Sequence, residues 1–400
     1  MQLLALSLPA MAATITVDRY GGADHTSIQD GINASQDGDT ISVAAATYYE
    51  AIDFDGKDLE VVSTSGAATT VIDADGDSEF AVTFSNHEGT GALLDGFTVR
   101  NGSAQGVSIT DASPRIHNST FSELGSTSTN GGSVAIDGGS PSIDSCTFEG
   151  GTGNLGGYIY VSGEATVMVD DSTFEDAVAN YGGSIYVDED ATLAMEDSRI
   201  DNGWTRYQGS GLYAHNRAVI SLTDTDFRSN TGYYVHGGAI YGGEYVALTI
   251  DGGLFDGNGP EPYYCSSYSG GAIWLNSHAS ADITDTVFED NVAYKGGAIY
   301  GDYNNVVTLT GTEINENRAS YGGAVYLYRY GTLQVDDADF DGNYAYYSGG
   351  DVWMYDTFDV DVTGSRFTDS TSANATGGSF YLYYYGTADF VDSDWDSAQS

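Results

Sequence analysis

The segments Gly270-Gly271-Ala272-Ile273-Trp274, Gly296-Gly297-Ala298-Ile299-Tyr300 and Gly322-Gly323-Ala324-Val325-Tyr326 share one pattern, and their first glycines are 26 residues apart. A glycine doublet is followed by apolar and aromatic side chains with a local apolar spacing of two. That spacing is typical of a β-strand and not of a helix. Other copies begin at Gly131, Gly156, Gly182, Gly209, Gly237, Gly349 and Gly377.

A second series of residues runs in step with the glycines. Its members are Phe121, Phe148, Phe174, Ile200, Phe227, Phe255, Phe288, Ile314, Phe340, Phe367 and Trp395, and an apolar residue stands five positions before each of them. Two series in phase, with a period in the twenties, indicate a solenoid in which each repeat forms one coil. We therefore predict an all-β fold, a parallel β-helix of about a dozen coils and roughly 55 to 60 Å in length at strand spacing.

The chain divides into three parts by composition. Residues 1–13 have the apolar stretch and small residues of a secretory signal, although a basic leader is missing. Residues 14–60 are expected to form an N-terminal cap and the first coils, with a short helix that Thr26 or Ser27 caps and in which Ile28 and Ile32 face one way. Residues 61–400 are assigned to β-helix repeats, with an insertion near 259–269.

The charge balance restricts the partners. The chain carries 58 acidic and 12 basic residues, a net charge of −46. Such a surface argues against binding nucleic acids or anionic membranes. After the signal, no stretch is long and apolar enough to span a bilayer.

Two cysteines are present, at positions that differ in context. Cys146 stands two residues before Phe148 and is expected to point inward, whereas Cys265 lies in the insertion. They are between four and five coils apart, or roughly 20 Å, so a disulfide within one chain is not expected.

The entry segment, Ile28-Gln29-Asp30-Gly31-Ile32 followed by Gly38-Asp39-Thr40-Ile41, resembles the start of secreted right-handed parallel β-helix proteins of the pectin-lyase-like superfamily. The later repeats resemble those of polymorphic outer-membrane protein passengers, with their Gly-Gly-Ala-Ile and Phe-x-x-Asn motifs. The first motif starts at Gly237, Gly270 and Gly296, and the second at Phe227, Phe255, Phe288 and Phe340. These motifs imply coils of a right-handed, single-stranded β-helix and imply no particular chemistry.

The middle aromatic residue of each strand after a glycine doublet is expected to point outward, because its apolar neighbours must face the core. The resulting external ladder consists of Tyr160, Tyr186, Tyr213, Tyr241, Trp274, Tyr300, Tyr326, Trp353 and Tyr381. One interpretation is that these rings only stabilise the sheet. The other is a surface that stacks against glycans or contacts another subunit, since large aromatic patches are unusual on isolated soluble proteins.

Two further ladders are polar. Asn230, Asn258, Asn291, Asn317 and Asn343 are expected to stack amide on amide at one turn. Carboxylates at neighbouring turns either remain solvated and screened by salt or bind Ca²⁺ between coils. The candidate ligands for Ca²⁺ are Asp170, Asp171, Glu196, Asp197, Asp336 and Asp337.

No catalytic residues are assigned. The six histidines are scattered over different coils, and His236 is expected at a turn. Pairs of carboxylates are too numerous to identify a glycosidase site, and the Arg-x-Lys segment of polygalacturonases is missing. Candidate glycosylation sites are Asn33, Asn101, Asn118 and Asn374.

Taken together, the sequence predicts a secreted or surface-displayed rod that is structural or adhesive. Its expected partners are carbohydrate or another cell-surface polymer, or further copies of itself in a filament. It needs no cofactor, with Ca²⁺ as the one ion expected if any is bound. The alternative is a polysaccharide lyase or glycoside hydrolase of the pectin-lyase-like superfamily.

Overall fold

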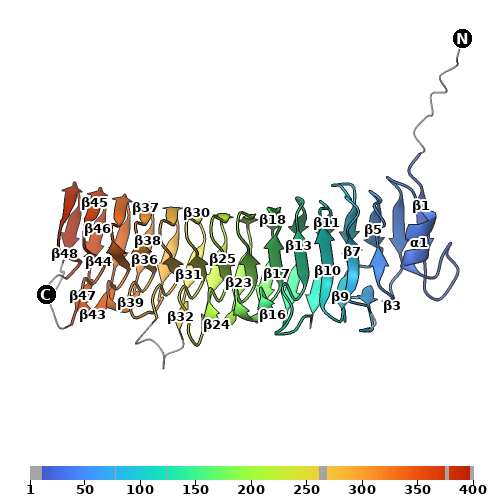
Figure 1. Cartoon of the computed structure of the whole chain (residues 1–400), viewed down its shortest axis with the longest axis horizontal. Coiled ribbons are helices and arrows are strands. Elements are labelled where there is room, and N and C mark those ends of the chain that lie inside the picture. Colours follow the sequence, from blue (N-terminus) through green and yellow to red (C-terminus); the bar gives the residue numbers. More distant parts are fainter. Residues whose placement is uncertain (1–10, 77, 123, 261–267, 374–377, 397–400) are drawn as a thin grey trace, which may run out of the picture.

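The structure is a computed structural model that describes residues 11–76, 78–122, 124–260, 268–373 and 378–396. Its coils stack side by side into one elongated rod, with the N-terminal helix at one end and the last coils at the other (Figure 1). All the strand pairs are parallel, and each strand pairs with the equivalent strand of the next coil. The predicted parallel β-helix is confirmed.

Three long sheets run the length of the rod among the described residues. The sheet that we call sheet A has 15 strands: β1 (Thr14–Val17), β2 (Thr40–Val43), β5 (Glu60–Ser63), β8 (Leu93–Asp95), β11 (Arg115–His117), β14 (Ser142–Asp144), β18 (Thr166–Asp170), β22 (Thr192–Glu196), β26 (Val219–Thr223), β30 (Ala247–Asp251), β34 (Ser280–Thr284), β37 (Val306–Thr310), β41 (Thr332–Asp336), β45 (Phe358–Thr363) and β49 (Gly386–Val391).

Sheet B follows sheet A in each coil. Within the described ranges it has 14 strands, which correspond to about 14 turns: β3 (Thr47–Tyr49), β6 (Val71–Asp73), β9 (Thr98–Arg100), β12 (Thr120–Ser122), β15 (Thr147–Glu149), β19 (Thr173–Glu175), β23 (Arg199–Asp201), β27 (Asp226–Arg228), β31 (Leu254–Asp256), β35 (Val287–Glu289), β38 (Glu313–Asn315), β42 (Asp339–Asp341), β46 (Arg366–Thr368) and β50 (Asp394–Asp396).

Sheet C closes each coil and contains the strands that follow the glycine doublets. In the part of the chain that the structure describes it has 13 strands: β4 (Ile52–Asp53), β7 (Phe80–Phe84), β10 (Gln105–Thr110), β13 (Val134–Asp137), β17 (Ile159–Ser162), β21 (Ile185–Val187), β25 (Leu212–Ala214), β29 (Ile240–Gly242), β33 (Ile273–Leu275), β36 (Ile299–Tyr303), β40 (Val325–Arg329), β44 (Val352–Tyr355) and β48 (Phe380–Tyr383).

From residue 152 onward the coils gain a fourth side, which lies between sheets B and C. Its first part is sheet D, formed by β16 (Thr152–Leu155), β20 (Val178–Tyr181), β24 (Trp204–Gln208), β28 (Thr231–Gly232) and β32 (Gly259–Pro260). Its second part is sheet E, formed by β39 (Arg318–Tyr321), β43 (Tyr344–Ser348) and β47 (Thr371–Ser372). The predicted insertion falls between these two sheets, and residues 261–267 of it, Cys265 included, lie outside the described residues.

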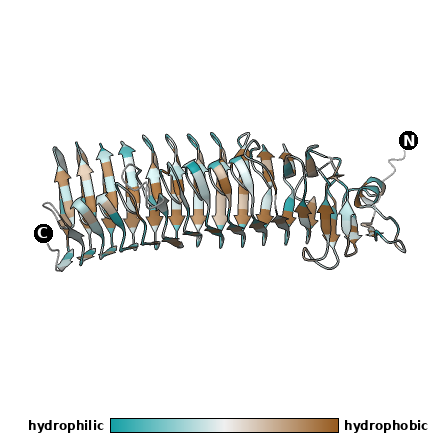
Figure 2. Cartoon of the chain, turned by 90° about the horizontal axis from the view of Figure 1, so that it is seen from below, coloured by the Kyte–Doolittle hydropathy of each residue, from teal (hydrophilic) through white to brown (hydrophobic). Residues whose placement is uncertain are grey.

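The core is a narrow stack of apolar side chains inside the coils. The residues of the second sequence series occupy the centre of sheet B in register, for example Phe121 opposite Phe148 and Phe148 opposite Phe174. Their rings stack at 4.7 and 4.5 Å between centroids. Bands of apolar residues recur at the same level from coil to coil (Figure 2). Cys146 lies in this core as predicted, and burial raises the pKa of its thiol to about 12.

Each coil turns at residues with positive φ. The corner between sheets A and B uses Asp at several levels, including Asp171, Asp197 and Asp337 with φ of 42°, 46° and 52°. Asp and Asn tolerate this left-handed conformation better than most residues do. The corner before sheet C uses the first glycine of the doublet, as at Gly182 with φ of 60°, where a Cβ atom would overlap the carbonyl oxygen of Ile185. The repeated turn residues are therefore required by the backbone.

The expected N-terminal cap is present. Helix α1 (Ile28–Ala34) buries Ile28 and Ile32 against the first coils, and the Ser27 hydroxyl accepts a hydrogen bond from the Asp30 amide. The Glu50 carboxylate accepts hydrogen bonds from the backbone N–H groups of Ile28 and Gln29, with N···O distances of 2.8 and 3.0 Å. These bonds satisfy backbone N–H groups at the start of the helix that have no partner within it.

The asparagine ladder is also confirmed. Each of its amides is buried, and the oxygen of one Asn accepts both the backbone N–H and the side-chain N–H of the Asn one coil earlier, at 2.9 to 3.1 Å. Asn343 ends the ladder by donating to Asp351 at 2.9 Å. In the ladder, buried backbone and side-chain N–H groups therefore find an acceptor in the Asn of the next coil, whose own side-chain amide is also hydrogen-bonded.

No helix within the described ranges is long and apolar enough to cross a membrane. Residues 1–10 of the predicted signal lie outside those ranges, and β1 begins at Thr14, directly after it. The domain boundaries and the signal stay predictions.

Candidate functional site

The nine predicted ladder residues stand in register on sheet C. The register runs from Tyr160 opposite Tyr186 to Trp353 opposite Tyr381. Neighbouring rings stack nearly parallel, with 4.3 to 5.9 Å between centroids. We call this column the first row. Its geometry follows from the parallel register, which places equivalent side chains of successive coils directly above one another.

The side chains of the first row are less exposed to solvent than we predicted for an external ladder. Tyr326 is 2% exposed, and Tyr186, Tyr241, Tyr300 and Trp353 are also buried. The ring faces cover one another, so along the column mainly ring edges are accessible. Burial raises the pKa of the phenol at Tyr213 to about 12 and also raises that of Tyr186 and Tyr326. These tyrosines stay neutral hydrogen-bonding groups at ordinary pH.

A second row of tyrosines flanks the first and was not predicted. It lies on the fourth side of the coils, just before the glycine doublets, and consists of Tyr181, Tyr207, Tyr234, Tyr268, Tyr294, Tyr321 and Tyr347. Neighbours from Tyr181 to Tyr268, and from Tyr294 to Tyr347, lie 4.9 to 6.4 Å apart. All are half-buried or exposed. The available signal in the sequence was a tyrosine one to three positions before the first glycine of each copy from Gly182 to Gly349.

The two rows touch across the glycine corner. Tyr181 meets Tyr213 edge-on at 5.7 Å, and Tyr321 meets Trp353 in the same way at 6.1 Å. Because glycine has no side chain, nothing separates the rows at this corner. We call the two rows together the aromatic band. The band is wider than the ladder predicted from the sequence, and its accessible part is mainly the second row.

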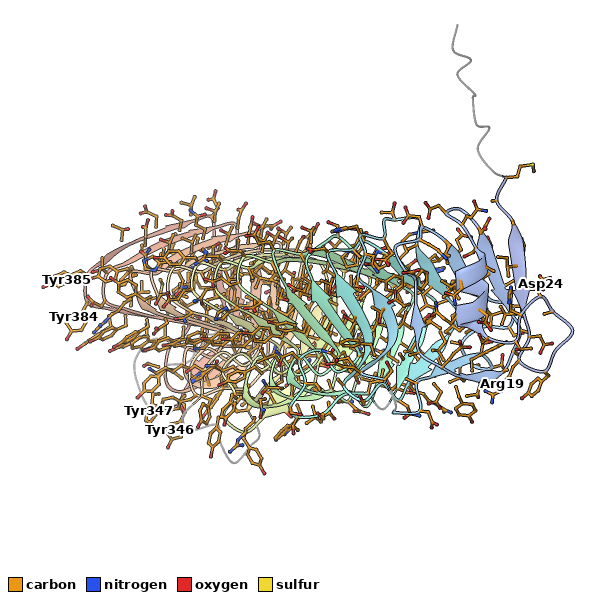
Figure 3. All side chains as sticks on the ribbon, turned by 45° about the vertical axis from the view of Figure 1, so that its right-hand side comes forward. Arg19, Asp24, Tyr346, Tyr347, Tyr384 and Tyr385 are labelled. Carbon is orange, nitrogen blue, oxygen red and sulfur yellow. The ribbon has the colours of Figure 1, made fainter. Side chains whose placement is uncertain are left out.

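The C-terminal coils widen the band further. Tyr328, Tyr355 and Tyr383 form a short third column with spacings of 5.4 and 5.5 Å. Tyr346 and Tyr347 project from one side of the rod near its C-terminal end, and Tyr384 and Tyr385 project from that end itself (Figure 3). Arg19 and Asp24 mark the opposite end. Exposed tyrosine therefore concentrates in the C-terminal half.

The first row has an open face where it begins. The residues before Tyr160 in register are Ala135 and Ser108, which are too small to cover its ring. A pocket of about 210 Å³ lies here, lined by residues that include Tyr160, Asp137, Ser162 and Gln105. At this point a flat ligand can reach a ring face that is hidden elsewhere in the row.

Polar groups gather beside Tyr160. Its hydroxyl donates to Asp188 Oδ2 at 2.7 Å, and His215 Nδ1 lies 3.2 Å from Asp188 Oδ1. The His215 ring lies 6.3 Å from both Tyr186 and Tyr213. Burial and the bond to Asp188 raise the pKa of the Tyr160 phenol. The phenol and the carboxylate are hydrogen-bonded to each other, whereas the His215 Nδ1 lies beside the carboxylate without a hydrogen bond in the described part of the chain. A carboxylate in this position can accept a proton.

Two other pockets lie near the insertion. One, of about 440 Å³, is lined by Trp204, Arg206, Tyr233 and Tyr234. The other, of about 420 Å³, is lined by residues that include Pro260, Val292 and Arg318. His236 is at the corner before Gly237, as expected, and burial lowers the pKa of its imidazole to about 4. It is therefore uncharged at neutral pH and packs on Trp274 at 5.5 Å.

The structure does not gather the predicted Ca²⁺ ligands into a coordinating cluster. Among the described residues, no three His, Cys, Asp or Glu side chains are placed to hold a metal ion together. Asp170 and Glu196 are in register, but Asp336 lies between Thr310 and Thr363. Asp171, Asp197 and Asp337 occupy left-handed corners, which accounts for their residue type without a metal. Bridging by Ca²⁺ stays a prediction.

The candidate glycosylation sites have different positions. Asn33, Asn101 and Asn118 are exposed, and Asn118 donates to Asp95 at 3.1 Å. Asn374 lies outside the described residues. Exposure makes modification sterically feasible at the first three sites and says nothing about whether it occurs.

Comparison with known protein families identifies the chain. The family described as the right-handed beta helix region matches residues 80–259 and 157–367, which together cover more than half of the chain. The chain therefore belongs to the right-handed β-helix family. This match agrees with the predicted handedness, and the finer resemblance to polymorphic outer-membrane passengers stays a prediction. No curated protein matches the chain significantly.

Several solved structures are similar. A mannuronic acid specific polysaccharide family 6 lyase from human gut microbiota has 12% identity and a TM-score of 0.47, over 94% of this chain and 92% of its own. The catalytic unit of a GH87 alpha-1,3-glucanase from Streptomyces thermodiastaticus has 13% identity and a TM-score of 0.47, over 98% and 71%. Carrot pectin methylesterase has 11% identity and a TM-score of 0.34, over 69% and 85%. The similarity is one of fold alone.

Proposed function

We propose that this chain is a secreted or surface-displayed β-helix protein that binds a carbohydrate polymer along the aromatic band. The observation that carries the proposal is the pair of stacked rows on adjoining sides of the rod, with the second row accessible. Large aromatic patches on soluble proteins mark interaction sites. Tyrosine presents a flat apolar body together with a hydroxyl, which suits a ligand whose rings have apolar faces and polar edges.

The shape of the rod supports a polymeric ligand. Successive rings lie at coil spacing, so a chain running parallel to the axis meets similar groups at each coil. The −46 net charge disfavours nucleic acids and polyanionic surfaces as partners. An uncharged or weakly charged glycan meets no such repulsion.

The test is affinity for insoluble and soluble polysaccharides, with variants of the accessible row. Tyr347, which is 41% exposed and stacks on Tyr321 at 4.9 Å, is the residue to change. We expect Tyr347→Ala to weaken binding about tenfold, the effect of losing about 1.4 kcal/mol. Tyr20→Ala is the control, because Tyr20 is an exposed tyrosine among the N-terminal residues before helix α1. Equal binding by both variants would exclude the second row as the binding surface.

Self-assembly through the same band is an alternative use of this surface. The first sequence interpretation, an adhesive or filamentous rod, includes this case. Sedimentation and electron microscopy of the purified protein separate the two: a monomer that binds glycan supports the proposal, whereas filaments that dissociate on Tyr347→Ala support assembly.

A polysaccharide lyase or glycoside hydrolase is the second candidate. It is favoured by Asp188, which lies between the Tyr160 hydroxyl and His215 next to a pocket. The similar structures named above are carbohydrate-active enzymes by their titles, although likeness at that level speaks only for fold. An enzyme that uses Asp188 in proton transfer would release unsaturated or reducing ends, and Asp188→Asn would lower that rate at least a hundredfold. Absence of product from a polymer that binds would leave a binding protein.

A further inference from the structure

Lys295 is a cation that lies against aromatic rings in an acidic chain. It directly precedes Gly296, at the corner where the two rows of the aromatic band meet. Its ammonium lies 4.8 Å from the ring centre of Tyr326 and 5.5 Å from that of Tyr328. Arg199 and Arg217 each lie within 2.8 Å of carboxylate oxygens on their own or neighbouring coils. Within the described ranges, Lys295 has no carboxylate within 4 Å, the limit that defines an ion pair.

The closest electrostatic partner of Lys295 is already engaged. Asp302 acts on the Lys295 charge at longer range, and its Oδ1 accepts from the Tyr300 hydroxyl at 3.3 Å. Burial lowers the pKa of the Lys295 ammonium, which the Asp302 charge partly offsets. The ammonium is thus held by ring faces, and these use none of its three N–H donors.

Lys295 lines a pocket of about 290 Å³ with Tyr294, Tyr321, Tyr326 and Trp353. This volume is near the lower end of the range for small-molecule sites. Trp353 is 8% exposed, and its indole Nε1–H has no hydrogen-bond partner in the part of the chain that the structure describes. A buried donor without an acceptor costs free energy that a bound acceptor would recover. Lys295 and Trp353 therefore both line this pocket and both carry an unused donor, and the indole Nε1–H has almost no accessible surface.

We propose that this pocket binds a sugar residue bearing a carboxylate or a sulfate, carried on an otherwise uncharged glycan. The anionic group accepts from the Lys295 ammonium and, after a reorientation of the ring that exposes its N–H, from the Trp353 indole, and the sugar ring packs against the tyrosines. The inference rests on the proposed carbohydrate-binding function and specifies its ligand. The charge must be isolated, because a fully charged polyanion would meet the field of a chain with net charge −46.

The experiment is calorimetry at low ionic strength with small probes of matched structure. The probes are methyl β-glucoside, methyl β-glucuronide, methyl β-glucoside 6-sulfate and inorganic sulfate, with polygalacturonate as the polyanion. We expect either charged sugar to bind about tenfold more tightly than the uncharged glucoside. The carboxylate and sulfate probes identify which anionic group is preferred.

Three variants complete the design. Lys295→Met removes the ammonium and keeps the side-chain length, and we expect it to abolish the preference for charged sugars. Trp353→Phe keeps the stacked ring, removes the N–H, and is expected to weaken charged sugars severalfold. Arg217→Met is the matched control, because it makes the same change in net charge at an exposed site on a different coil. Circular dichroism and thermal unfolding confirm that each variant is folded.

Each remaining outcome has a definite meaning. If none of these small sugars binds but uncharged polysaccharides still bind to the second row, this inference alone falls; if neither sugars nor polysaccharides bind, the proposed function falls as well. If charged and uncharged sugars bind equally to the wild-type protein, or if Lys295→Met keeps the preference, only the anionic pocket is overturned. Free sulfate binding as tightly as the sulfated sugar would overturn recognition of the sugar. Polygalacturonate binding more tightly per residue than the glucuronide would overturn the requirement for an isolated charge.

Discussion

The coils before β17 and those from β17 onward have similar core residues but different residues on the outer face of sheet C. In both regions the centre of sheet B carries stacked apolar residues such as Phe121 and Phe340. On the outer face of sheet C, by contrast, the row changes from Thr83, Ser108 and Ala135 to nine consecutive aromatic residues. The fourth side of the coils, which carries the second row, begins at the same level with β16.

This difference distinguishes the inner apolar residues, which the stacking of coils requires, from the outer aromatic residues, which it does not require. The inner rows are required wherever a coil stacks on the next, because each repeat can bury its apolar face only against its neighbours. The outer face of sheet C tolerates threonine, serine or alanine, so the fold does not demand aromatic rings there. A long uninterrupted run of them is therefore better evidence for binding than any single exposed aromatic residue.

The largest expected effect tests whether the inner structure is the same in both regions. Phe121→Ala and Phe340→Ala each remove a fully buried ring that stacks on its neighbour at 4.7 Å. We expect each to lower the free energy of unfolding by about 3 to 5 kcal/mol. Urea unfolding followed by circular dichroism measures both. A difference between them well above 1 kcal/mol would show that the two regions are not built alike.

The next effect concerns Asp351, a fully buried acid in the C-terminal region. Asp351 occupies the position of the alanine in Gly-Gly-Ala-Ile, and burial raises the pKa of its carboxyl to about 7 from the ordinary 3.8. Asn343 and the Ser370 hydroxyl donate to its Oδ1 at 2.9 and 2.6 Å, whereas Oδ2 has no partner among the described residues. The folded protein therefore favours the protonated acid.

Because the pKa is raised, the folded state holds this proton more strongly than the unfolded chain does. Stability is then complete below about pH 4 and falls as the pH rises through about 7. We expect Asp351→Asn to match the wild type at about pH 3.5 and to be more stable at pH 8, by at most about 4 kcal/mol. Unfolding measured at both pH values tests this, and Asp361→Asn, on the exposed face of β45, is the control. Equal stability of the Asp351 variant and the wild type at pH 8 would contradict a neutral buried acid.

The smallest effect sharpens the boundary between the regions. Ala135→Tyr would extend the first row by one coil, since Ala135 is opposite Tyr160 in register. The added stacked pair should raise the free energy of unfolding by about 0.5 to 1.5 kcal/mol and fill the pocket beside Tyr160. Thermal unfolding measures the gain. Ala135→Leu adds apolar volume without a ring, and an equal gain from it would show that stacking is not the cause.

The sequence was sufficient to predict the coils and the first row, but not the surface features that neighbouring coils form together. The glycine and phenylalanine series predicted the solenoid, its inner rows and the first row, because register repeats exactly in a parallel stack. The second row was not predicted because the number of residues between each tyrosine and the following glycine varies from coil to coil. Shifts in the strand register between Ala179 and Tyr181, and between Ala319 and Tyr321, accommodate this variation. The carboxylates suggested Ca²⁺ because the sequence alone does not reveal which aspartates have positive φ.

The Lys295 pocket was beyond sequence reasoning for a related reason. Lys295 and Trp353 are contributed by different coils, and Tyr321 and Tyr326 come from the coil between them. Pattern analysis treats each coil separately, whereas the pocket exists only between coils. Charge composition also misleads here, since the total of −46 does not show that the Lys295 ammonium lies against rings and not against a carboxylate.

Because equivalent coils stack at a constant spacing, the length of the rod is proportional to the number of repeats. Residues 296–321 form one complete period, from one glycine doublet to the residue before the next. Their removal would join Lys295 to Gly322, keep every register and shorten the rod by one strand spacing of about 4.8 Å. The number of repeats thus sets the length of the aromatic band in steps of a single coil.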